Sequence, residues 1–177
     1  MIIIMGAIGS GKSEQATRLA ASLGCPHIST SRLLQENLTP ELEAKMHAGE
    51  LISDEKILGL LDKELAGVRA STNQCVLDGA PRSVIQAEWL VKKQEAGQIK
   101  IDSVIKLNVS DQTVLNRLLK RGREDDTKEV ILHRLSEYTK ITEPVVEYFR
   151  QQGVGVHEIN GELSLDEVEA EIKKVIN

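Results

Sequence analysis

The chain has 177 residues, of which 41% are hydrophobic and 28% are charged, and its formal net charge is −5. That length and composition predict one soluble globular domain with a buried core. The acidic balance disfavours binding to nucleic acids, because a protein that neutralises their phosphates usually carries a basic excess. No run is long and apolar enough to span a membrane, so we expect a cytoplasmic protein, and we expect it to be monomeric.

Five short apolar runs recur along the chain and predict β-strands. They cover Ile2–Met5, Pro26–Ile28, Gln74–Leu77, Ser103–Leu107 and Val154–Ile159. Helical patterns lie between them, and strands that alternate with helices are typical of a parallel sheet covered on both faces. The sequence therefore predicts an α/β fold with a five-stranded parallel sheet in a single domain, residues 1–177.

Capping residues indicate where several helices begin. Pro40 suits a first helical position, and Ser53 and Ser110 each precede a helical pattern. Two further starts resemble capping boxes, in which a glutamate follows the capping residue by three positions: Asp126 with Glu129, and Ser164 with Glu167.

Residues from about 30 to about 61 lie between the second and third predicted strands and contain two short helical patterns. We interpret this insertion as a movable helical flap on the main body of the domain.

A glycine-rich segment directly follows the first predicted strand and directly precedes an amphipathic helix. It consists of Gly6-Ala7-Ile8-Gly9-Ser10-Gly11-Lys12-Ser13, followed by Glu14. Glycines allow backbone N–H groups to converge on phosphate oxygens, and the helix N-terminus adds its positive dipole end. Lys12 offers a charge to the β- and γ-phosphates of a nucleotide, and Ser13 offers a hydroxyl ligand to Mg²⁺. A chance glycine-rich turn is the alternative, and the strand–loop–helix context disfavours it.

Asp78 directly follows the third predicted strand. A carboxylate there can hold the hydration shell of Mg²⁺ together with Ser13. A single aspartate at the end of a strand is equally typical of a helix cap, so its position alone leaves both interpretations open.

Arginines are prominent in the second half of the chain, at positions 82, 117, 121, 123 and 134. Arg117 and Arg121 lie one helical turn apart and share a face. Such a face is often merely solvated, but guanidinium groups also suit the bidentate binding of several phosphates.

Together these segments resemble the adenylate kinase family of nucleoside monophosphate kinases over nearly the whole chain. They stand in the family's order: the Gly6–Ser13 loop, His27–Thr30, Ala48–Ile52, Leu77–Arg82 with Gln86, Arg117 with Arg121, Arg123–Asp126 with Arg134, and Tyr138 through Pro144 to Tyr148. The resemblance implies a three-layer P-loop kinase fold. It also implies Mg²⁺-dependent, in-line transfer of a phosphoryl group from ATP to AMP, which yields two ADP.

The resemblance further implies roles for individual residues. The residues expected to bind ATP are Gly6, Gly9, Ser10, Gly11, Lys12, Ser13, Glu14, Arg117, which resembles the residue that stacks on adenine, and Arg121. The residues expected to bind the acceptor are Thr30 and Gln86, which resemble readers of the base, Ile52 through its carbonyl, Gly79, Arg82, Arg123 and Arg134. The residues expected to supply the catalytic charges are Lys12, Arg82, Arg121, Arg123 and Arg134. Asp125 and Asp126 resemble a hinge pair that binds arginines and starts the next helix.

Several features depart from the family's pattern, and two of them concern the lid and the acceptor. Only Gly122 separates Arg121 from Arg123, which leaves a minimal lid of about residues 121–126. Gln35 stands where the family usually carries an arginine for the acceptor phosphate. Arg32 lies one helical turn away and either reaches that phosphate instead or faces solvent, so both Arg32 and Gln35 are candidates for acceptor binding.

Two other functions are consistent with the sequence. One is a kinase for a different nucleoside monophosphate, although Gln86 favours adenine. The other is a non-catalytic nucleotide-binding module, which the loss of arginine at Gln35 favours. The full set of transfer residues, from Lys12 to Arg134, argues against a module that only binds.

Overall fold

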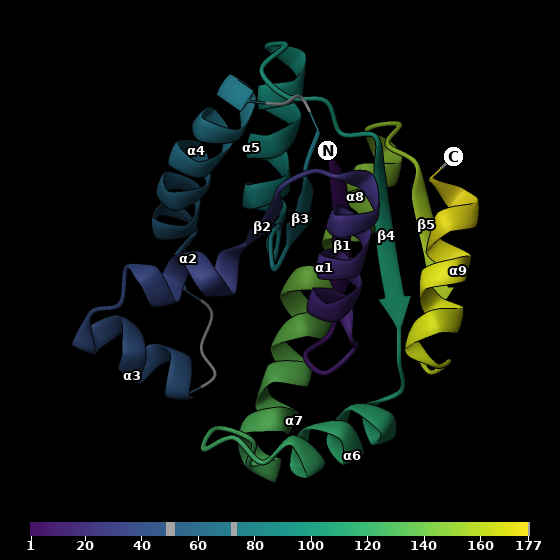
Figure 1. Ribbon diagram of the computed structural model, residues 1–177. Coiled ribbons are helices and arrows are strands. Elements are labelled where there is room, and N and C mark those ends of the chain that lie inside the picture. Colours follow the sequence, from purple (N-terminus) through teal and green to yellow (C-terminus); the bar gives the residue numbers. More distant parts are fainter. Residues whose placement is uncertain (49–51, 72–73, 177) are drawn as a thin grey trace.

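Parallel strands and helices alternate along the chain in a computed structural model, which describes residues 1–48, 52–71 and 74–176 (Figure 1). The elements follow in this order: β1 (Ile2–Gly6), α1 (Lys12–Leu23), β2 (His27–Ser29), α2 (Thr30–Glu36), α3 (Pro40–Ala48), α4 (Asp54–Ser71), β3 (Val76–Asp78), α5 (Val84–Glu95), β4 (Ser103–Asn108), α6 (Asp111–Arg121), α7 (Lys128–Glu137), the π-helical turn η1 (Tyr138–Thr142), α8 (Glu143–Gln151), β5 (Val156–Asn160) and α9 (Leu165–Val175).

The five strands form one parallel sheet in the order β2-β3-β1-β4-β5. Ile2 of β1 lies opposite Val76 of β3 on one side and Ser103 of β4 on the other. The predicted parallel sheet is confirmed, and its strands differ from the predicted runs by one or two residues. The third strand, for example, begins at Val76 and includes Asp78.

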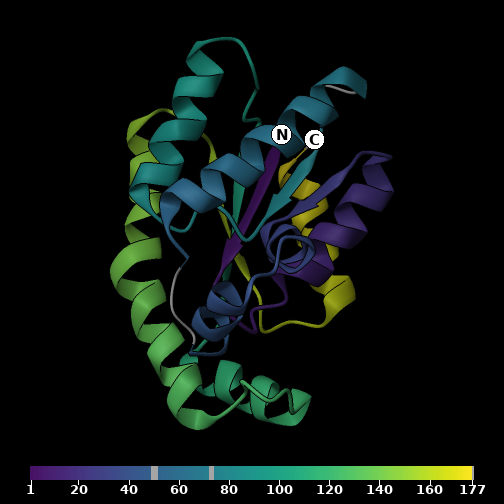
Figure 2. The same cartoon turned by 90° about the vertical axis from the view of Figure 1, so that its left-hand side faces the viewer.

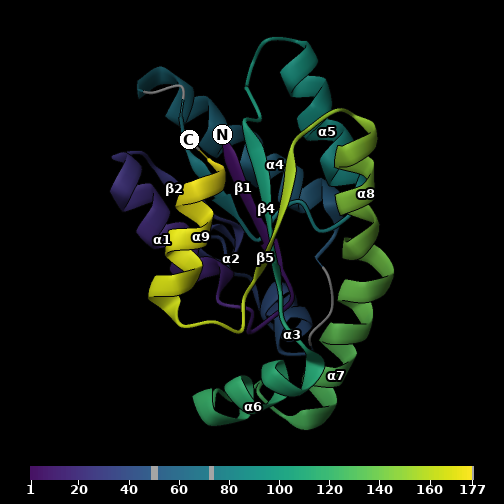
Figure 3. The same ribbon diagram turned by 90° about the vertical axis from the view of Figure 1, so that its right-hand side faces the viewer.

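Helices cover both faces of the sheet, so the predicted three-layer arrangement is also confirmed. Ile2 and Ile4 of β1 belong to a core cluster with residues of α1 and α9. Ile3 and Met5, which point the other way in a pleated strand, belong to a second cluster with residues of α4, α5 and α8. Figure 3 shows the layers, with α1 and α9 on one side of the strands and α5 and α8 on the other.

The helical insertion after β2 is larger than predicted. It contains α2, α3 and an 18-residue α4, rather than two short pieces that end near residue 61. The second half of α4 packs on the body of the domain, where Leu61 and Leu65 are buried in the same cluster as Leu77 of β3. Burial of this apolar stripe explains why α4 continues beyond the predicted boundary.

Local capping is confirmed at most predicted positions and is wrong at one. The Ser164 hydroxyl and the Glu167 side chain form the expected capping box at α9. At α7 the capping side chain is Thr127, whose Oγ1 accepts from the N–H of Val130, and not Asp126. The carboxylate of Asp126 is instead bound by Arg121, whose charged guanidinium is a stronger partner than a backbone N–H.

Helices α7 and α8 form one column through the π-helical turn between them (Figure 2). Thr142 of that turn donates from Oγ1 to the carbonyl of Arg82, 2.8 Å away, so the column supports the loop after β3. Within the part of the chain that the structure describes, no helix has the length and apolarity needed to cross a membrane.

Candidate active site

A cleft of about 1110 Å³ opens at the carboxyl ends of β1 and β3. The helices that follow these neighbouring strands, α1 and α5, cover opposite faces of the sheet, and such a switch point is where open α/β sheets bind ligands. The cleft is lined by the loops after β1 and β3, by the flap, and by α6 and α7. Every predicted site residue lines it except Ser10 and Asp78, both of which are buried.

The glycine loop between β1 and α1 leaves its backbone accessible from the cleft. Gly11 caps α1 with a φ of 91°, in the left-handed region that favours glycine. Apart from the chain neighbours of Gly11, no heavy atom of the described part of the chain lies within 4 Å of the position that a side chain there would occupy. The loop therefore presents an open helix N-terminus, which is a ready anion site when combined with a lysine.

Lys12 brings a titratable charge to this loop. Its Nζ donates to the carbonyl of Ala7 at 3.3 Å. Although the side chain keeps some contact with solvent, desolvation by the surrounding protein lowers its pKa to about 8, and the nearby charges of Arg82 and Arg121 act in the same direction. The negative charge of Asp78 opposes this decrease, so the two residues are electrostatically coupled.

Asp78 ends β3 and is 1% exposed. Its Oδ1 has no hydrogen-bond partner among the described residues, and its Oδ2 lies 3.9 Å from Nε2 of His27. Burial by itself raises the pKa of Asp78, but His27, Lys12 and Ser13 together outweigh burial, so the pKa lies below its usual value. Asp78 is therefore an ionised carboxylate with an unused oxygen.

The turn after β3 brings Gly79 against Thr30 of α2. Gly79 has a φ of 84°, and a side chain there would overlap Oγ1 of Thr30. Oγ1 of Thr30 donates to the carbonyl of Asp78 at 3.3 Å. Only glycine allows this close approach, which fixes α2 against the end of β3.

Arg82 and Gln86 are held at the start of α5. The guanidinium of Arg82 donates to the carbonyl of Gly79 at 3.0 Å. Its backbone N–H donates to Oε1 of Gln86 at 2.8 Å. Gln86 is 3% exposed and lines the cleft, so these contacts fix its amide at the wall of the cleft.

The arginines of α6 and the lid occupy the opposite wall. Arg117 donates to the carbonyls of Gly9 at 3.4 Å and Gly161 at 2.9 Å. Arg121 makes a two-point ion pair with Asp126, with distances of 2.8 and 2.6 Å. The guanidinium of Arg123 is exposed and makes no hydrogen bond or ion pair with the described residues.

Arg134 of α7 links the lid to the flap. Its Nη2 donates to Oδ2 of Asp125 at 2.7 Å and to the carbonyl of Met46, in α3, at 2.8 Å. The predicted pairing of Asp125 and Asp126 with arginines is thus confirmed. Arg134 therefore contacts both segments that are predicted to move, the flap and the lid, and it also lines the cleft.

The cleft also includes three residues that were predicted to bind the acceptor: Arg32, Gln35 and Ile52. Arg32 is half exposed and lies 3.6 Å from the carboxylates of both Glu36 and Glu64, and it also donates to the carbonyl of His27. Arg32 thus borders the cleft and is also paired at the surface, so its binding of the acceptor phosphate stays a prediction. Of the predicted segment 48–52, residues 49–51 lie outside the described residues.

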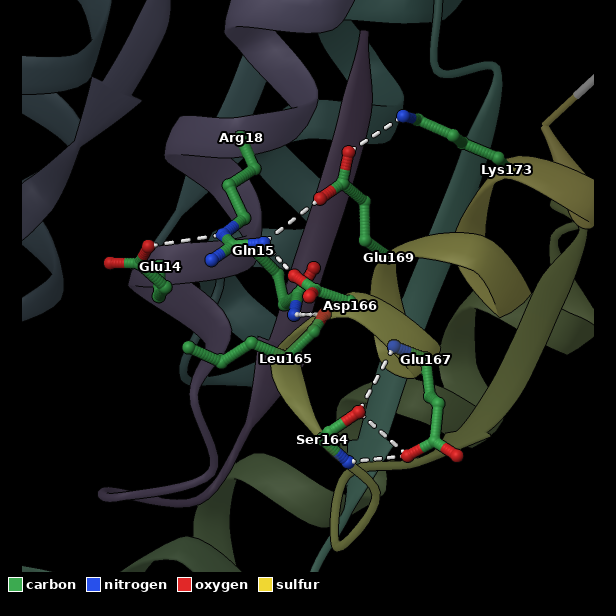
Figure 4. Close-up of polar contacts among 9 residues, drawn as sticks. All are labelled: Glu14, Gln15, Arg18, Ser164, Leu165, Asp166, Glu167, Glu169 and Lys173. Carbon is green, nitrogen blue, oxygen red and sulfur yellow. Dashed lines mark hydrogen bonds and ion pairs between the residues drawn. The ribbon is translucent and has the colours of Figure 1, made fainter.

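Glu14 was predicted to contribute to the phosphate loop, and its side chain points to a different network (Figure 4). Its carboxylate accepts from Nε of Arg18 at 3.1 Å, and Arg18 also pairs with Asp166 and Glu169 of α9. Nε2 of Gln15 donates to the carbonyl of Leu165 at 2.8 Å. Helix α9 is thereby tied to α1, which carries the loop, and the backbone of Glu14 is what remains for phosphate binding.

Among the cleft residues that were not predicted as site residues, Asp54 and Thr142 contact predicted ones. Asp54 accepts hydrogen bonds from Gln86 and Ser83, although its place at the start of α4 indicated only a helix cap. Thr142 supports Arg82 from the π-helical turn. Thr142 lies between Tyr138 and Pro144, in a segment that carries the family resemblance, so the sequence did point to this region. Nothing local in the sequence links Asp54 to Gln86.

The parallel sheet, with a glycine loop and lysine between β1 and α1 and an arginine-lined cleft above it, defines a P-loop kinase fold. Comparison with known proteins narrows that class. Residues 4–154 match the family described as adenylate kinase. The chain is 41% identical over 173 residues to an adenylate kinase of Mycobacterium sp. (strain MCS), with 94% of this chain and 93% of that protein covered.

Other relatives give the same result. An adenylate kinase of Parasynechococcus marenigrum (strain WH8102) is 37% identical, with 99% and 98% of the two chains covered. One of Mycobacterium tuberculosis (strain ATCC 25177 / H37Ra) is 40% identical, with 85% and 86% covered. The chain therefore belongs to the adenylate kinase family, and it is an enzyme of the nucleoside monophosphate kinase class.

Proposed function

We propose that this enzyme transfers the γ-phosphoryl group of ATP to AMP and forms two ADP, as its relatives' names suggest. The observation that carries the proposal is the single cleft that joins the glycine loop and Lys12 on one side to Arg82, Gln86 and Arg134 on the other. A module that only binds one nucleotide has no need of a second set of side chains that bind phosphate. In-line transfer needs both sets, facing each other.

The residues at the carboxyl ends of β1 and β3 fit Mg²⁺. Asp78 is buried and ionised, one of its oxygens has no hydrogen bond from the described residues, and the hydroxyl of Ser13 is close enough to influence its pKa. Oxygen ligands of this kind are those that Mg²⁺ prefers. Bound there with ATP, Mg²⁺ would offset negative charge on the phosphates. Ser13 and Asp78 are the residues that we propose to hold it.

Catalysis in this proposal consists of positioning and charge. Lys12 and the loop amides hold the donor phosphates, and Arg82 and Arg134 hold the acceptor phosphate. Arg121 and Arg123 neutralise the charge of the group in transit. No general base is needed, because the attacking group is already a phosphate anion. Closure of the flap and of the lid, about residues 121–126, would exclude water, which would otherwise accept the phosphoryl group.

The proposed acceptor rests on Gln86, which lines the same cleft as Thr30 and Ile52. Gln86 presents an amide that can both donate to and accept from a base, which suits adenine. Another monophosphate is the second candidate acceptor, since Gln35 replaces the arginine that the family usually carries.

An assay with each monophosphate in turn tests the proposal. Purified protein is mixed with Mg²⁺ and ATP and with AMP, GMP, CMP or UMP, and formation of the nucleoside diphosphate is measured. We expect AMP to give the highest kcat/KM and chelation of Mg²⁺ to abolish the reaction. A higher kcat/KM with another monophosphate would make that monophosphate the acceptor in place of AMP. If no monophosphate yields a diphosphate, the proposed transfer is wrong and only nucleotide binding is left.

A further inference from the structure

A hydrogen-bonded cluster joins the first turn of α4 to the first turn of α5 at the wall of the cleft. Oδ1 of Asp54 accepts from Nε2 of Gln86 at 2.8 Å and from Oγ of Ser83 at 2.6 Å. Oγ of Ser83 in turn accepts from the backbone N–H of Gln86 at 3.2 Å. All three residues line the cleft, so the cluster holds Gln86 where a ligand can reach it.

The chemistry of the two partners fixes which way the Gln86 amide faces. On one side the backbone N–H of Arg82 can only donate, and it lies 2.8 Å from Oε1 of Gln86. On the other side the carboxylate of Asp54 can only accept, and it lies 2.8 Å from Nε2. Turning the amide over would set donor against donor at Arg82 and acceptor against acceptor at Asp54. Gln86 is 3% exposed, so water cannot readily compensate for either mismatch.

A fixed amide has a fixed pattern of hydrogen bonds to offer. After its contacts with Arg82 and Asp54, Gln86 retains one N–H on Nε2 and one lone pair on Oε1. Adenine matches this pattern, because N1 accepts and the adjacent 6-amino group donates. A 6-oxopurine such as hypoxanthine has the opposite pattern, because N1 carries a hydrogen and O6 accepts. A glutamine that could turn over freely would satisfy either base.

We propose that Asp54 is a positioning residue that makes this site select adenine over 6-oxopurines, by preventing the amide of Gln86 from turning over. The inference deepens the proposed function and rests on it, since Gln86 must face the acceptor base. Asp54 itself need not touch the nucleotide. Its effect is on the ratio of kcat/KM for AMP to kcat/KM for IMP, the nucleotide of hypoxanthine.

The test compares this ratio in the wild type and in two variants. Asp54→Asn keeps the size of the side chain but can donate as well as accept, so we expect the AMP-to-IMP ratio to decrease about threefold. Asp54→Ala removes the partner altogether, and we expect a decrease of about tenfold. The KM for ATP should stay unchanged in both variants, because the cluster lies on the acceptor side.

Glu55→Gln is the matched control, because Glu55 lies in the same turn of α4, is exposed and does not line the cleft. It makes the same change of charge as Asp54→Asn, and we expect the wild-type ratio. Thermal unfolding of each variant is measured in parallel. If Asp54→Ala does not fold, the nearly isosteric Asp54→Asn still carries the test.

The outcomes separate this inference from the function on which it rests. A wild-type ratio in Asp54→Asn and in any folded Asp54→Ala, together with normal transfer to AMP, would overturn the role of Asp54 and leave the proposed function intact. A wild type that transfers nothing to AMP would overturn both. A general loss of activity or stability with the AMP-to-IMP ratio unchanged would show a purely structural role for Asp54.

Discussion

At the scale of single residues, most of the cationic side chains in the cleft are already held by protein groups. Arg121 is paired with Asp126, Arg134 with Asp125, and Arg82 with the carbonyl of Gly79. The guanidinium of Arg123 has no such partner among the described residues. Arg123 can therefore reach a ligand without breaking a contact, which suits a residue that acts on the group in transit.

We predict that Arg123→Ala lowers kcat by a factor on the order of a thousand, as expected for an arginine that stabilises the transition state. The Kd for ATP should change little, because the glycine loop and Lys12 bind the ground state. Steady-state kinetics and ATP titration measure the two effects. Lys120→Ala, which removes an exposed charge three residues away along the chain, is the control and should behave as the wild type. A parallel loss of ATP affinity and turnover would contradict the role of Arg123.

The lowered pKa of Lys12 predicts a pH dependence of ATP binding. With a pKa of about 8, Lys12 is charged below that pH and loses its proton above it. Because the charge attracts the phosphates, the Kd for ATP should rise between about pH 7 and about pH 9. Asp78 raises the pKa of Lys12, so Asp78→Asn should move the increase to lower pH.

Calorimetric titration with ATP across this range measures the effect. Lys12→Arg, which keeps its charge throughout, should give a nearly flat curve. A wild-type Kd that is independent of pH would show that Lys12 does not titrate there or does not bind the phosphates.

Arg32 is the residue that we predict to replace the arginine missing at Gln35. To bind the acceptor phosphate, it must exchange Glu36 and Glu64 for that phosphate. Arg32→Ala should raise the KM for AMP about tenfold to a hundredfold, the value of a lost charge-assisted hydrogen bond, and leave the KM for ATP nearly unchanged. Gln35→Arg should partly restore AMP binding in that background.

Arg150→Ala is a suitable control for Arg32, because Arg150 is also half exposed and also pairs with two glutamates, but lies outside the cleft. An unchanged KM for AMP in Arg32→Ala would mean that Arg82 and Arg134 hold the acceptor phosphate without it.

At the scale of elements, the connection between α6 and α7 is the segment predicted to form the lid. Helix α6 ends at Arg121 with Gly122 in the left-handed conformation, and α7 begins at Lys128. So short a lid covers little of a γ-phosphate. We predict measurable hydrolysis of ATP in the absence of acceptor, faster than in a family member with a long lid.

Phosphate release by the two enzymes, measured side by side without AMP, tests this prediction. A rate equal to or lower than that of the long-lid enzyme would show that the short lid excludes water adequately. In that case the flap, through the contact of Arg134 with Met46, would be the element that closes the site.

Elements were predictable where the signal is local. The box of Ser164 and Glu167 is complete within four residues, so the start of α9 could be predicted from the sequence. The start of α7 was assigned to Asp126 because the competing partner, Arg121, lies outside that window. The length of α4 depends on packing of Leu61 and Leu65 against the sheet, which no local pattern reveals.

At the scale of the whole molecule, the order of apolar runs and helices was enough to predict a five-stranded parallel sheet with its phosphate loop. The loop has a sequence signature because its backbone conformation requires glycine at fixed positions. The cluster of Asp54, Ser83 and Gln86 has no such signature, because it joins residues about thirty positions apart only after folding. The partners of the arginines were predictable only through the family resemblance.

Direct transfer between two nucleotides in one cleft is the central claim, and one labelling experiment tests it. The protein is incubated with Mg²⁺, AMP and ATP that carries a radioactive γ-phosphate, and the products are separated. Direct transfer predicts that the label appears in the β-phosphate of ADP far faster than in inorganic phosphate, and that two ADP form for each ATP consumed. Label that appears mainly as inorganic phosphate, or that remains in ATP, would contradict the claim.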